Sequence, residues 1–525
     1  MCLFKPKIRT RFAPSPTGQL HVGGLKTALY AYLFAKQNKG VFFLRLEDTD
    51  QTREIPGAVE NLLKSLKWVG IEPDGGIILD KSGKIAEKGK FGPYTQSKRL
   101  PIYQKYAQKL VAQGSAYYCF CSPERLETLR RDQEASHQPT RYDWHCRYLL
   151  PDEIKIRLDK GDKYVIRLKV PENRIISFID LVRGQVTFNS REIDDQVLLK
   201  ADGFPTYHLA HVVDDYLMKT SHIIRGEEWL SSTPKHLLLF EFLNWPAPHY
   251  AHLPLILNAD KSKLSKRQGD VAVEDYRCQG YLPEALINFV AFLGWNPGTE
   301  QEIFSLPELV KAFSFQQVHK AGAIFNSEKL DWMNSVYIKK LPLEKFTELA
   351  TPYLFSAHPY QGGAEPPKGA KGGVENLKKE TIKKIFALEQ TRVSKLSEVG
   401  QGIEFLFQDQ LNYDAKLLIW KKSDLAATKR NLSLVAEEFK NYQSGDWNKE
   451  ILEKKLKEFI AKNNLTNGEI LWPLRVALTG LEKSPTPFEV AEILGKNRTL
   501  KRISEAIEKL NHNIPRPLGV GLMAD

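Results

Sequence analysis

Two short segments of the chain carry residue types that suit the binding of phosphate groups. The first is GQLHVGG at residues 18–24, which joins an expected strand to an expected helix. A helix N-terminus presents unpaired backbone N–H groups and a partial positive charge, so it favours anions. Gly23 and Gly24 leave room for a nucleotide to approach closely, and His21 can donate a hydrogen bond to a phosphate oxygen. The segment is neither a GxGxxG nor a Walker A motif, and on its own it is typical of a tight turn with a surface histidine.

The second segment is the basic loop KSKLSKRQGD at residues 261–270. Four hydrogen-bond donors lie close together in it: Lys263, Ser265, Lys266 and Arg267. Such a loop can close over a triphosphate and neutralise the charge that develops on a departing pyrophosphate. The alternative is a solvated basic loop, which is the commoner meaning of a run of charges.

The elements around the first segment predict the opening of a parallel α/β sheet. Residues 8–13 favour a strand, and residues 14–18 form a loop rich in helix-breaking residues. From Leu25 to Gln37 apolar residues recur at helical spacing, and residues 41–46 indicate a buried strand that ends in acids. Strand, loop, helix and strand in this order are typical of α/β proteins.

Later segments predict the rest of the plan. Residues 75–92 are rich in glycine and lysine, so we expect an exposed insertion or hairpin there. Residues 205–245 repeat the α/β alternation, and residues 357–373 are expected to be a linker or mobile loop because glycine and proline crowd them. Beyond that stretch the signals are almost only helical. We therefore expect an α/β half followed by a basic helical half.

Composition limits the class of protein. The chain has 525 residues, 42% of them hydrophobic, and a formal net charge of +12, which predicts several globular domains and favours a polyanionic partner such as nucleic acid. Its richest apolar run, residues 286–295, is too short for a membrane helix and is expected to form a core helix. Five cysteines, an odd and sparse set, argue for a reducing compartment, and the first residues lack the apolar core of a secretory signal.

Together the two phosphate-binding segments resemble a known pair of signatures. APSPTGQLHVGG (13–24) with KLSKR (263–267), in this order, resembles the paired motifs of class I aminoacyl-tRNA synthetases. The resemblance is closest to the glutamyl-tRNA synthetase family of the bacterial type. Further segments that resemble this family are RFAPSPTG (11–18), LRLEDTD (44–50), GPYTQSKRL (92–100), DGFPTYHLAHVVDD (202–215), IIRGEEWLSSTPKH (223–236), SKLSKRQGD (262–270) and WPLRVALTG (472–480).

The resemblance implies a fold and a set of domains. The catalytic domain is expected to be α/β and Rossmann-like, with an inserted acceptor-stem domain, followed by an all-α anticodon-binding region. The expected ranges are 1–98 with 207–245 for the catalytic domain, 99–206 for the insert, 246–344 for a stem-contact domain that carries the KLSKR loop, and 345–525 for the helical region. Lysine-rich helices interleaved with tryptophans in the last region suit contact with RNA, although a solvated face is the simpler meaning of most of them.

By resemblance, a set of residues would bind L-glutamate. They are Arg11, Ala13, Ser15, Glu47, Tyr207, Arg225 and His211. A guanidinium suits a carboxylate, so we expect Arg225 to bind the side-chain carboxylate of glutamate and Glu47 to face its ammonium. For Arg11 or Glu47 taken singly, a structural ion pair is the alternative. His211 stands where many relatives carry asparagine.

The ATP site follows in the same way. The positions implied for it are His21, Gly23, Gly24, Glu228, Trp229, Lys263, Ser265 and Lys266, of which His21, Lys263 and Lys266 are the expected catalytic residues. The glutamate α-carboxylate is already ionised and attacks the α-phosphate in line, so no general base is needed. Catalysis then rests on positioning and on charge stabilisation, with Mg²⁺ on ATP. The expected partners are ATP, L-glutamate and tRNA-Glu, with tRNA-Gln left open.

Three cysteines suggest a structural zinc site. Cys119, Cys121 and Cys146 resemble the family's Cys-x-Cys-x24-Cys-x-His/Tyr pattern, and three thiolates suit Zn²⁺. Tyr148 fills the expected fourth slot, while Tyr142 and His145 are further candidates. The alternative is three buried thiols without a metal.

Other functions compete with this interpretation. Glutaminyl-tRNA synthetases typically carry PEPNG where this chain has PSPTG, and they have a β-rich anticodon domain. An RNA-binding protein with a dead nucleotide site is opposed by the intact motif residues, and a small-molecule nucleotidylyltransferase would have no use for a basic helical half. We expect a monomer in the bacterial cytoplasm without a membrane partner, with the mitochondrial matrix as the alternative location.

Overall fold

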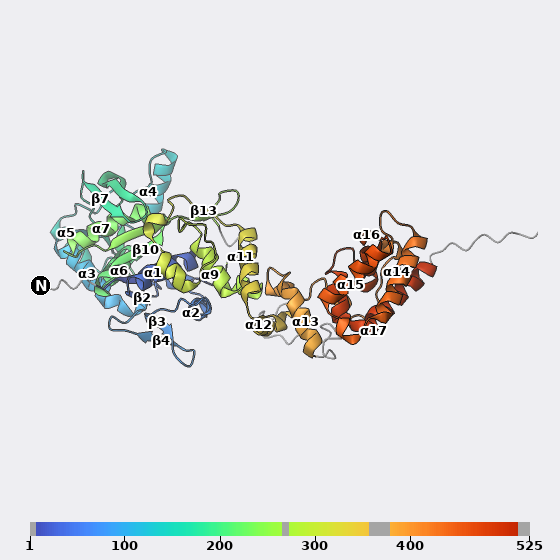
Figure 1. Ribbon diagram of the computed structural model, residues 1–525. Coiled ribbons are helices and arrows are strands. Elements are labelled where there is room, and N and C mark those ends of the chain that lie inside the picture. Colours follow the sequence, from blue (N-terminus) through green and yellow to red (C-terminus); the bar gives the residue numbers. More distant parts are fainter. Residues whose placement is uncertain (1–6, 265–271, 356–378, 513–525) are drawn as a thin grey trace, which may run out of the picture. The chain divides into compact units, whose positions relative to one another are not determined.

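The computed structural model describes residues 7–264, 272–355 and 379–512. It divides into two compact units (Figure 1). Unit 1 comprises Met1–Arg277 and Tyr281–Asn334, and unit 2 comprises Cys278–Gly280 and Ser335–Asp525. Among the described residues no helix is long and apolar enough to span a membrane.

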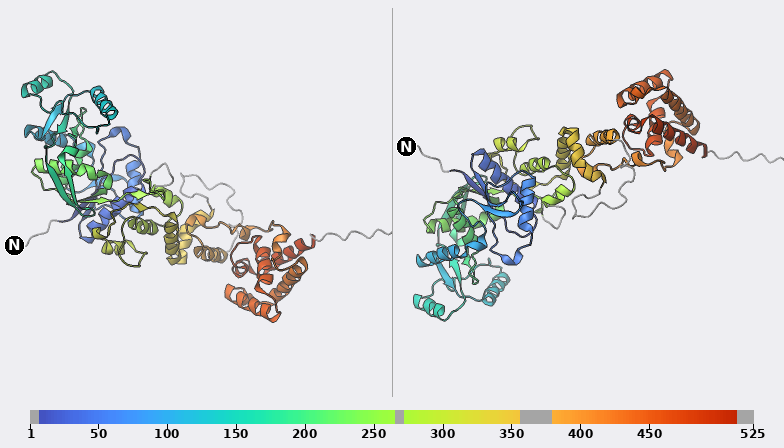
Figure 2. Two further views of the ribbon diagram at one scale, coloured as in Figure 1. Left: turned by 90° about the horizontal axis from the view of Figure 1, so that it is seen from above. Right: turned by 90° about the horizontal axis from the view of Figure 1, so that it is seen from below.

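Unit 1 is built on an eight-stranded sheet with the strand order β4-β3-β2-β1-β10-β11-β7-β8. Its strands are β1 (Arg9–Phe12), β2 (Val41–Leu44), β3 (Gly75–Leu79), β4 (Ile85–Lys88), β7 (Ile175–Asp180), β8 (Gly184–Asn189), β10 (His222–Gly226) and β11 (His249–Leu253). The strands from β3 to β7 in this order run parallel, whereas the edge strands β4 and β8 run antiparallel to their neighbours. Early (blue) and later (green) strands therefore lie side by side (Figure 2).

The direction in which the chain adds strands reverses between β1 and β10. From β1 the chain passes through α1 (Val22–Gln37) to β2 and through α2 (Ala58–Trp68) to β3, towards one edge of the sheet. From β10 it passes through α7 (Thr233–Phe242) to β11, towards the other edge. In open parallel sheets ligands bind at the carboxyl ends of the strands beside such a reversal. The predicted site residues that follow β1 and β10 therefore meet at the favoured place.

Helix α1 anchors this part of the sheet. Its side chains are almost all apolar, and Leu25, Leu29 and Leu33 are fully buried. It packs against β1, β2 and α9 (Pro283–Ala291), the core helix expected from the apolar run at residues 286–295. Burying one leucine side chain contributes roughly 1.5–3 kcal/mol. The N-terminus of α1 is thus held rigidly at the end of β1.

The segment expected as an inserted domain contributes to two sheets. A separate antiparallel sheet contains β5 (Ala116–Cys119), β6 (Val165–Leu168) and β9 (Val197–Leu199). The helices of this segment are α3 (Leu100–Ala112), α4 (Pro123–Ala135) and α5 (Pro151–Asp159), and α6 (Tyr207–Leu217) follows it directly. Strands β7 and β8 lie in the same stretch of sequence but extend the main sheet, because β7 pairs with β11.

Two further expectations concern connecting segments. Within the glycine- and lysine-rich segment 75–92, residues 75–88 form the β3–β4 hairpin, which confirms the expected hairpin. Residues 357–373, expected as a linker, lie outside the described residues.

The remaining elements between residues 256 and 340 are β12 (Ile256–Leu257), β13 (Ala323–Ile324), α8 (Val273–Cys278), α10 (Leu306–Ala312) and α11 (Ser327–Lys340).

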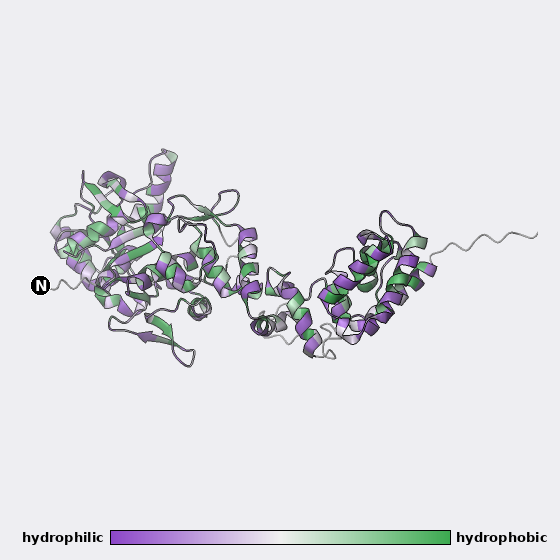
Figure 3. Ribbon diagram, in the orientation of Figure 1, coloured by the Kyte–Doolittle hydropathy of each residue, from purple (hydrophilic) through white to green (hydrophobic). Residues whose placement is uncertain are grey.

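Unit 2 is helical over its described residues, as expected. Its helices are α12 (Leu343–Phe355), α13 (Lys379–Gln390), α14 (Leu425–Asn441), α15 (Lys449–Lys462), α16 (Asn467–Thr479) and α17 (Pro487–His512), the last interrupted at Gly495. Apolar and polar residues both occur along these helices, as is typical of amphipathic helices (Figure 3). Trp420 packs on Trp472 with ring centroids 5.4 Å apart, and Trp447 packs on Phe439 at 5.5 Å. These tryptophans therefore support the helical core.

Candidate active site

Two adjoining pockets lie where the strand direction reverses. The helix pocket has a volume of about 450 Å³ and surrounds the N-terminus of α1. The arginine pocket has a volume of about 600 Å³ and contains Arg11 of β1 and Arg225 of β10 in its wall. Five residues line both pockets: Phe12, Ser15, Thr27, Gly226 and Glu228. Two ligands bound in these pockets would therefore lie side by side.

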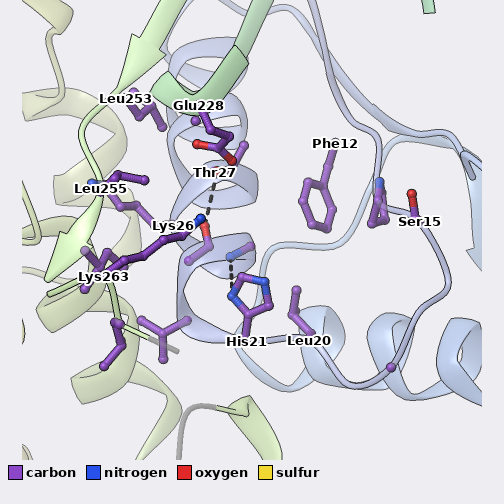
Figure 4. Close-up of a pocket in the computed structure, with 18 of the residues that line it drawn as sticks. Phe12, Ser15, Leu20, His21, Lys26, Thr27, Glu228, Leu253, Leu255 and Lys263 are labelled. Carbon is purple, nitrogen blue, oxygen red and sulfur yellow. Dashed lines mark hydrogen bonds between the residues drawn. The ribbon is translucent and has the colours of Figure 1, made fainter. Parts of the chain in front are cut away.

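Most residues predicted for ATP line the helix pocket. They are His21, Gly23, Gly24, Glu228 and Lys263 (Figure 4). Trp229 lines the arginine pocket instead, where it packs on Tyr207 with ring centroids 4.0 Å apart. The two remaining predicted residues, Ser265 and Lys266, lie outside the described residues. Trp229 and Glu228 belong to a short 3-10 helix, η4 (Glu227–Ser232), which follows β10 directly.

His21 caps helix α1. Its Nδ1 accepts a hydrogen bond from the backbone N–H of Gly24 at 3.2 Å (Figure 4). In a neutral imidazole with an accepting Nδ1, the proton lies on Nε2, which is then a donor. A Cβ at Gly24 would lie 3.0 Å from the side chain of Leu20, so glycine preserves the packing of this turn. The loop thus fixes both the tautomer and the position of a histidine at the positive end of a helix.

Lys26 is a pocket residue that the sequence interpretation missed. It lines the helix pocket, is 2% exposed, and donates from Nζ to the carbonyl of Pro254 at 2.7 Å. Burial lowers the pKa of Lys26 to about 7, while the nearby Glu227 acts in the opposite direction. The available signal was a lysine as the only charged residue between Leu25 and Ala35 in an otherwise apolar helix.

The residues predicted for glutamate gather in the arginine pocket with one exception. Arg11, Ala13, Ser15, Glu47, Tyr207 and Arg225 all line it. His211 does not: it is fully buried behind Tyr207, with ring centroids 4.8 Å apart. Its Nδ1 lies 3.1 Å from a carboxylate oxygen of Asp215. Lys200, which no motif indicated, also lines the pocket.

Arg11 and Glu47 belong to a buried network of charges. Arg11 Nε donates to Asp215 Oδ1 at 3.1 Å, and Arg45 donates to the same oxygen and to Glu47 Oε1, each at 2.8 Å. Burial raises the pKa of Glu47, and its bond to Arg45 opposes this change. The pKa of Asp215 lies well below its ordinary value, because Arg11 and Arg45 outweigh the effect of burial. Both predicted residues therefore face the pocket and also form the structural ion pairs that were the alternative.

Arg225 is bound in a different way. Its Nε donates to His252 Nε2 at 3.0 Å, and its Nη2 donates to the hydroxyl of Thr233 at 2.9 Å. Its Nη1 donates to the hydroxyl of Tyr207 at 3.2 Å. The side chain is 4% exposed, yet within the described parts of the chain it forms no ion pair with a carboxylate. A buried guanidinium with only neutral partners leaves its charge for an anionic ligand.

The three cysteines of the zinc prediction come together, but Tyr148 does not join them. The Sγ atoms of Cys119, Cys121 and Cys146 lie within 4.8 Å of one another. The hydroxyl of Tyr148 instead donates to Glu172 at 2.9 Å, and 64% of Tyr148 is exposed. Tyr148 follows Cys146 by two positions, and its side chain lies at the surface.

Tyr142 occupies the fourth position of this cluster. Its hydroxyl oxygen lies 3.3 Å from Cys119 Sγ and 3.4 Å from Cys121 Sγ, and it accepts the backbone N–H of Cys146 at 2.9 Å. A hydrogen bond with Cys146 lowers the pKa of Cys119 to about 4, against the effect of burial. Three clustered sulfur donors suit a zinc ion, and the Tyr142 hydroxyl lies beside them.

Comparisons with known proteins agree on the class of the chain. The family described as tRNA synthetases class I (E and Q), catalytic domain, matches residues 7–332, and the anticodon binding domain family matches residues 345–507. A glutamate–tRNA ligase of Clostridioides difficile (strain 630) is 45% identical over 498 residues, which cover 95% of this chain and 98% of that protein. One from Alkaliphilus metalliredigens (strain QYMF) is 44% identical over 508 residues, which cover 96% of this chain and 99% of that protein.

A solved structure agrees with these sequences. The crystal structure of a glutamate tRNA ligase from Elizabethkingia meningosepticum CCUG26117, in complex with its amino acid, aligns with a TM-score of 0.82 and 36% identity, over 96% of this chain and all of that one (100%). The similarity thus extends along both the α/β part and the helical part. The chain belongs to the glutamate–tRNA ligase family of class I aminoacyl-tRNA synthetases.

Proposed function

We propose that this chain is a glutamate–tRNA ligase, which activates L-glutamate with ATP and transfers the glutamyl group to the 3′-terminal adenosine of tRNA-Glu. The observation that carries this assignment is the buried, uncompensated guanidinium of Arg225 in a pocket that adjoins the N-terminus of α1. Arg225 binds the side-chain carboxylate of glutamate in this proposal. Glu47, whose Oε1 is held by Arg45, faces the substrate ammonium.

The first step forms glutamyl-adenylate. A glutamate carboxylate oxygen attacks the α-phosphorus of ATP, the bond to the bridging oxygen breaks, and pyrophosphate leaves with the electron pair. ATP enters as its magnesium complex, in which the metal shares the phosphate charge. His21 donates to a phosphate oxygen, while Lys26 and Lys263 supply positive charge within the same pocket. The shared wall of the two pockets keeps the reacting groups adjacent.

The second step transfers the glutamyl group to tRNA. A ribose hydroxyl of the terminal adenosine, the 2′-hydroxyl by class, attacks the carbonyl carbon of the adenylate, and AMP leaves. The anticodon-binding family match over residues 345–507 supports tRNA as the partner of unit 2. We propose that bound tRNA is required before glutamate is activated and that tRNA-Gln is a second acceptor to be tested. The proposal also holds that the enzyme is a monomer and that it works in the cytoplasm, where the cysteines of the Cys119, Cys121 and Cys146 cluster stay reduced.

A structural Zn²⁺ is the second part of the proposal. Cys119, Cys121, Cys146 and Tyr142 would hold it, and the metal would cross-link the loop after β5 to residues 142–146. No step of the reaction involves this site. Its role is to fix the fold of the region that is expected to bind the acceptor stem.

The test is ATP–pyrophosphate exchange with glutamate and with glutamine, each with and without tRNA-Glu. We expect exchange only with glutamate and tRNA together. Exchange with glutamine would move the assignment to glutaminyl-tRNA synthetase, and tRNA binding without any exchange would leave an RNA-binding protein with a dead site.

Arg225→Gln should raise the glutamate KM by about 100-fold, the effect of losing a charged hydrogen-bond partner, and should leave the ATP KM unchanged. An aminoacylation assay with tRNA-Gln then decides whether the enzyme accepts this tRNA as well as tRNA-Glu.

A further inference from the structure

Arg225 is held by a chain of side chains that starts at a buried carboxylate on another strand. Asp180, at the end of β7, is 2% exposed, and its Oδ2 lies 2.6 Å from Nδ1 of the fully buried His252 on β11. The other nitrogen of that ring, Nε2, accepts from Nε of Arg225 at 3.0 Å. The chain Asp180–His252–Arg225 therefore links β7, β11 and β10, which are neighbours in the sheet.

The directions of these hydrogen bonds follow from chemistry. A guanidinium can only donate, so His252 Nε2 must accept, and the imidazole is neutral with its proton on Nδ1. That proton points at the carboxylate of Asp180, which fixes the tautomer. Asp180 Oδ1 is occupied by the backbone N–H groups of Val182 and Arg183, each at 2.9 Å. The carboxylate cannot turn away without breaking these bonds.

A second neutral histidine lies on the other side of Arg225. His236 Nδ1 lies 3.3 Å from Arg225 Nη2, and its Nε2 lies 2.9 Å from Nδ1 of His208. By the same reasoning Nδ1 of His236 accepts and its Nε2 donates to His208. The two imidazole rings that accept from the guanidinium are therefore both uncharged.

Other buried arginines of the chain bond carboxylates directly, whereas Arg225 does not. Arg11 and Arg45 are each bonded directly to a carboxylate of Asp215, and Arg99 is bonded to Asp214 at 2.8 Å. Carboxylates would position Arg225 as well, but they would also cancel its charge. An imidazole between Arg225 and Asp180 holds the guanidinium in place and keeps the acid one ring further away.

We propose that Asp180, His252 and His236 are positioning residues that aim Arg225 and preserve its charge for the side-chain carboxylate of the substrate. This inference rests on the proposed function, in which that substrate is glutamate. It assigns the preference for an anionic over an amide side chain to these neutral partners as well as to Arg225 itself.

The experiment compares variants of the full-length chain by tRNA-dependent pyrophosphate exchange. In Asp180→Asn the side-chain oxygen remains with the N–H groups of Val182 and Arg183, so the amide nitrogen faces His252 and forces its proton onto Nε2. His252 Nε2 and Arg225 Nε are then both hydrogen-bond donors, so the bond between them is lost. We expect the glutamate KM to rise by about 10–100-fold, with the ATP KM changed by less than about twofold. The ratio of kcat/KM for glutamate over glutamine should fall by a similar factor.

Two further variants separate positioning from folding. His252→Ala should reproduce the loss, whereas His252→Gln, which offers a carbonyl acceptor to Arg225, should recover most of it. His222→Gln is the matched control: His222 lies at the other end of β10 and bonds Ser221 rather than Arg225. The inference is overturned if Asp180→Asn and His252→Ala match this control. It is also overturned if the KM values for glutamate and ATP rise together, because a general structural defect would act on both pockets. An inactive wild-type chain would instead refute the proposed function.

Discussion

The guanidinium of Arg45 donates to the carboxylate of Glu47 at 2.8 Å, and both side chains are buried at the back of the arginine pocket. The other end of the same guanidinium bonds Asp215, the partner of Arg11. One arginine outside the pocket thus fixes the positions of two residues that line it. The shape and charge of the pocket depend on this network as a unit.

Breaking this network should cost stability as well as activity. Arg45→Met leaves the buried Glu47 and Asp215 without one of their guanidinium partners, so we expect a loss of about 3–5 kcal/mol in the free energy of unfolding. Urea titration measures this loss. Arg53→Met removes the exposed ion pair with Asp50 and should leave the free energy of unfolding almost unchanged. Equal costs for the two variants would contradict the central role of Arg45.

Lys26 should make ATP binding depend on pH. Its pKa of about 7 means that its positive charge is lost as the pH rises from 6 to 8, so the KM for ATP should rise several-fold over that interval. Lys26→Arg keeps its charge at every pH and should remove the dependence that belongs to this residue. Initial rates at saturating glutamate and tRNA provide the measurement. A profile that is the same for lysine and arginine would show that Lys26 does not contact the nucleotide.

The zinc site predicts different effects on zinc affinity for two tyrosine substitutions. The purified chain should contain one zinc ion per molecule by elemental analysis. Tyr142→Phe removes the oxygen beside the thiols and should lower zinc affinity by about 10–100-fold, whereas Tyr148→Phe, matched in chemistry but exposed, should not change it. Competition with a chelator measures both. Zinc loss caused only by Tyr148→Phe would restore the ligand set expected from the motif.

Buried neutral histidines should make the fold sensitive to acid. Burial lowers the pKa of His208 and of His211 to about 3, from 6.5 in the unfolded chain. Below pH 6.5 the unfolded chain binds protons that the native chain excludes, so the free energy of unfolding falls as the pH falls. Each such histidine contributes up to about 1.4 kcal/mol per pH unit between its two pKa values.

The variant His211→Asn tests whether buried neutral histidines make the fold sensitive to acid. It replaces the imidazole with an uncharged amide, so between pH 6.5 and 5 the free energy of unfolding should depend on pH less steeply, by the contribution of one proton. His137→Asn, at an exposed position, is the control and should leave the slope unchanged. Urea titrations at each pH measure the slope. An unchanged slope in His211→Asn would show that this imidazole is protonated in the native state.

The sequence contained the local information about both pockets. Gly24 and His21 follow β1 at the spacing of a helix cap, and Arg11 and Arg225 stand on segments that favour strands. These features depend on neighbours along the chain, because capping, strand alternation and helical periodicity act over a few residues. Ala13, Ser15, Glu47 and Tyr207 were expected at the site only because their motifs resemble those of a known family, and all four line the arginine pocket.

Only the tertiary structure decided which charges are paired. Arg11 meets Asp215 across 204 positions of sequence, and His252 meets Asp180 across 72, because strand order and register bring them together. The same process placed Tyr142 rather than Tyr148 beside the cysteines. The sequence by itself therefore determined that this protein has two arginines on segments that form strands. The packing of distant segments decided that Arg11 is neutralised and Arg225 is not, since a buried charge takes its partner from whatever the fold brings within about 3 Å.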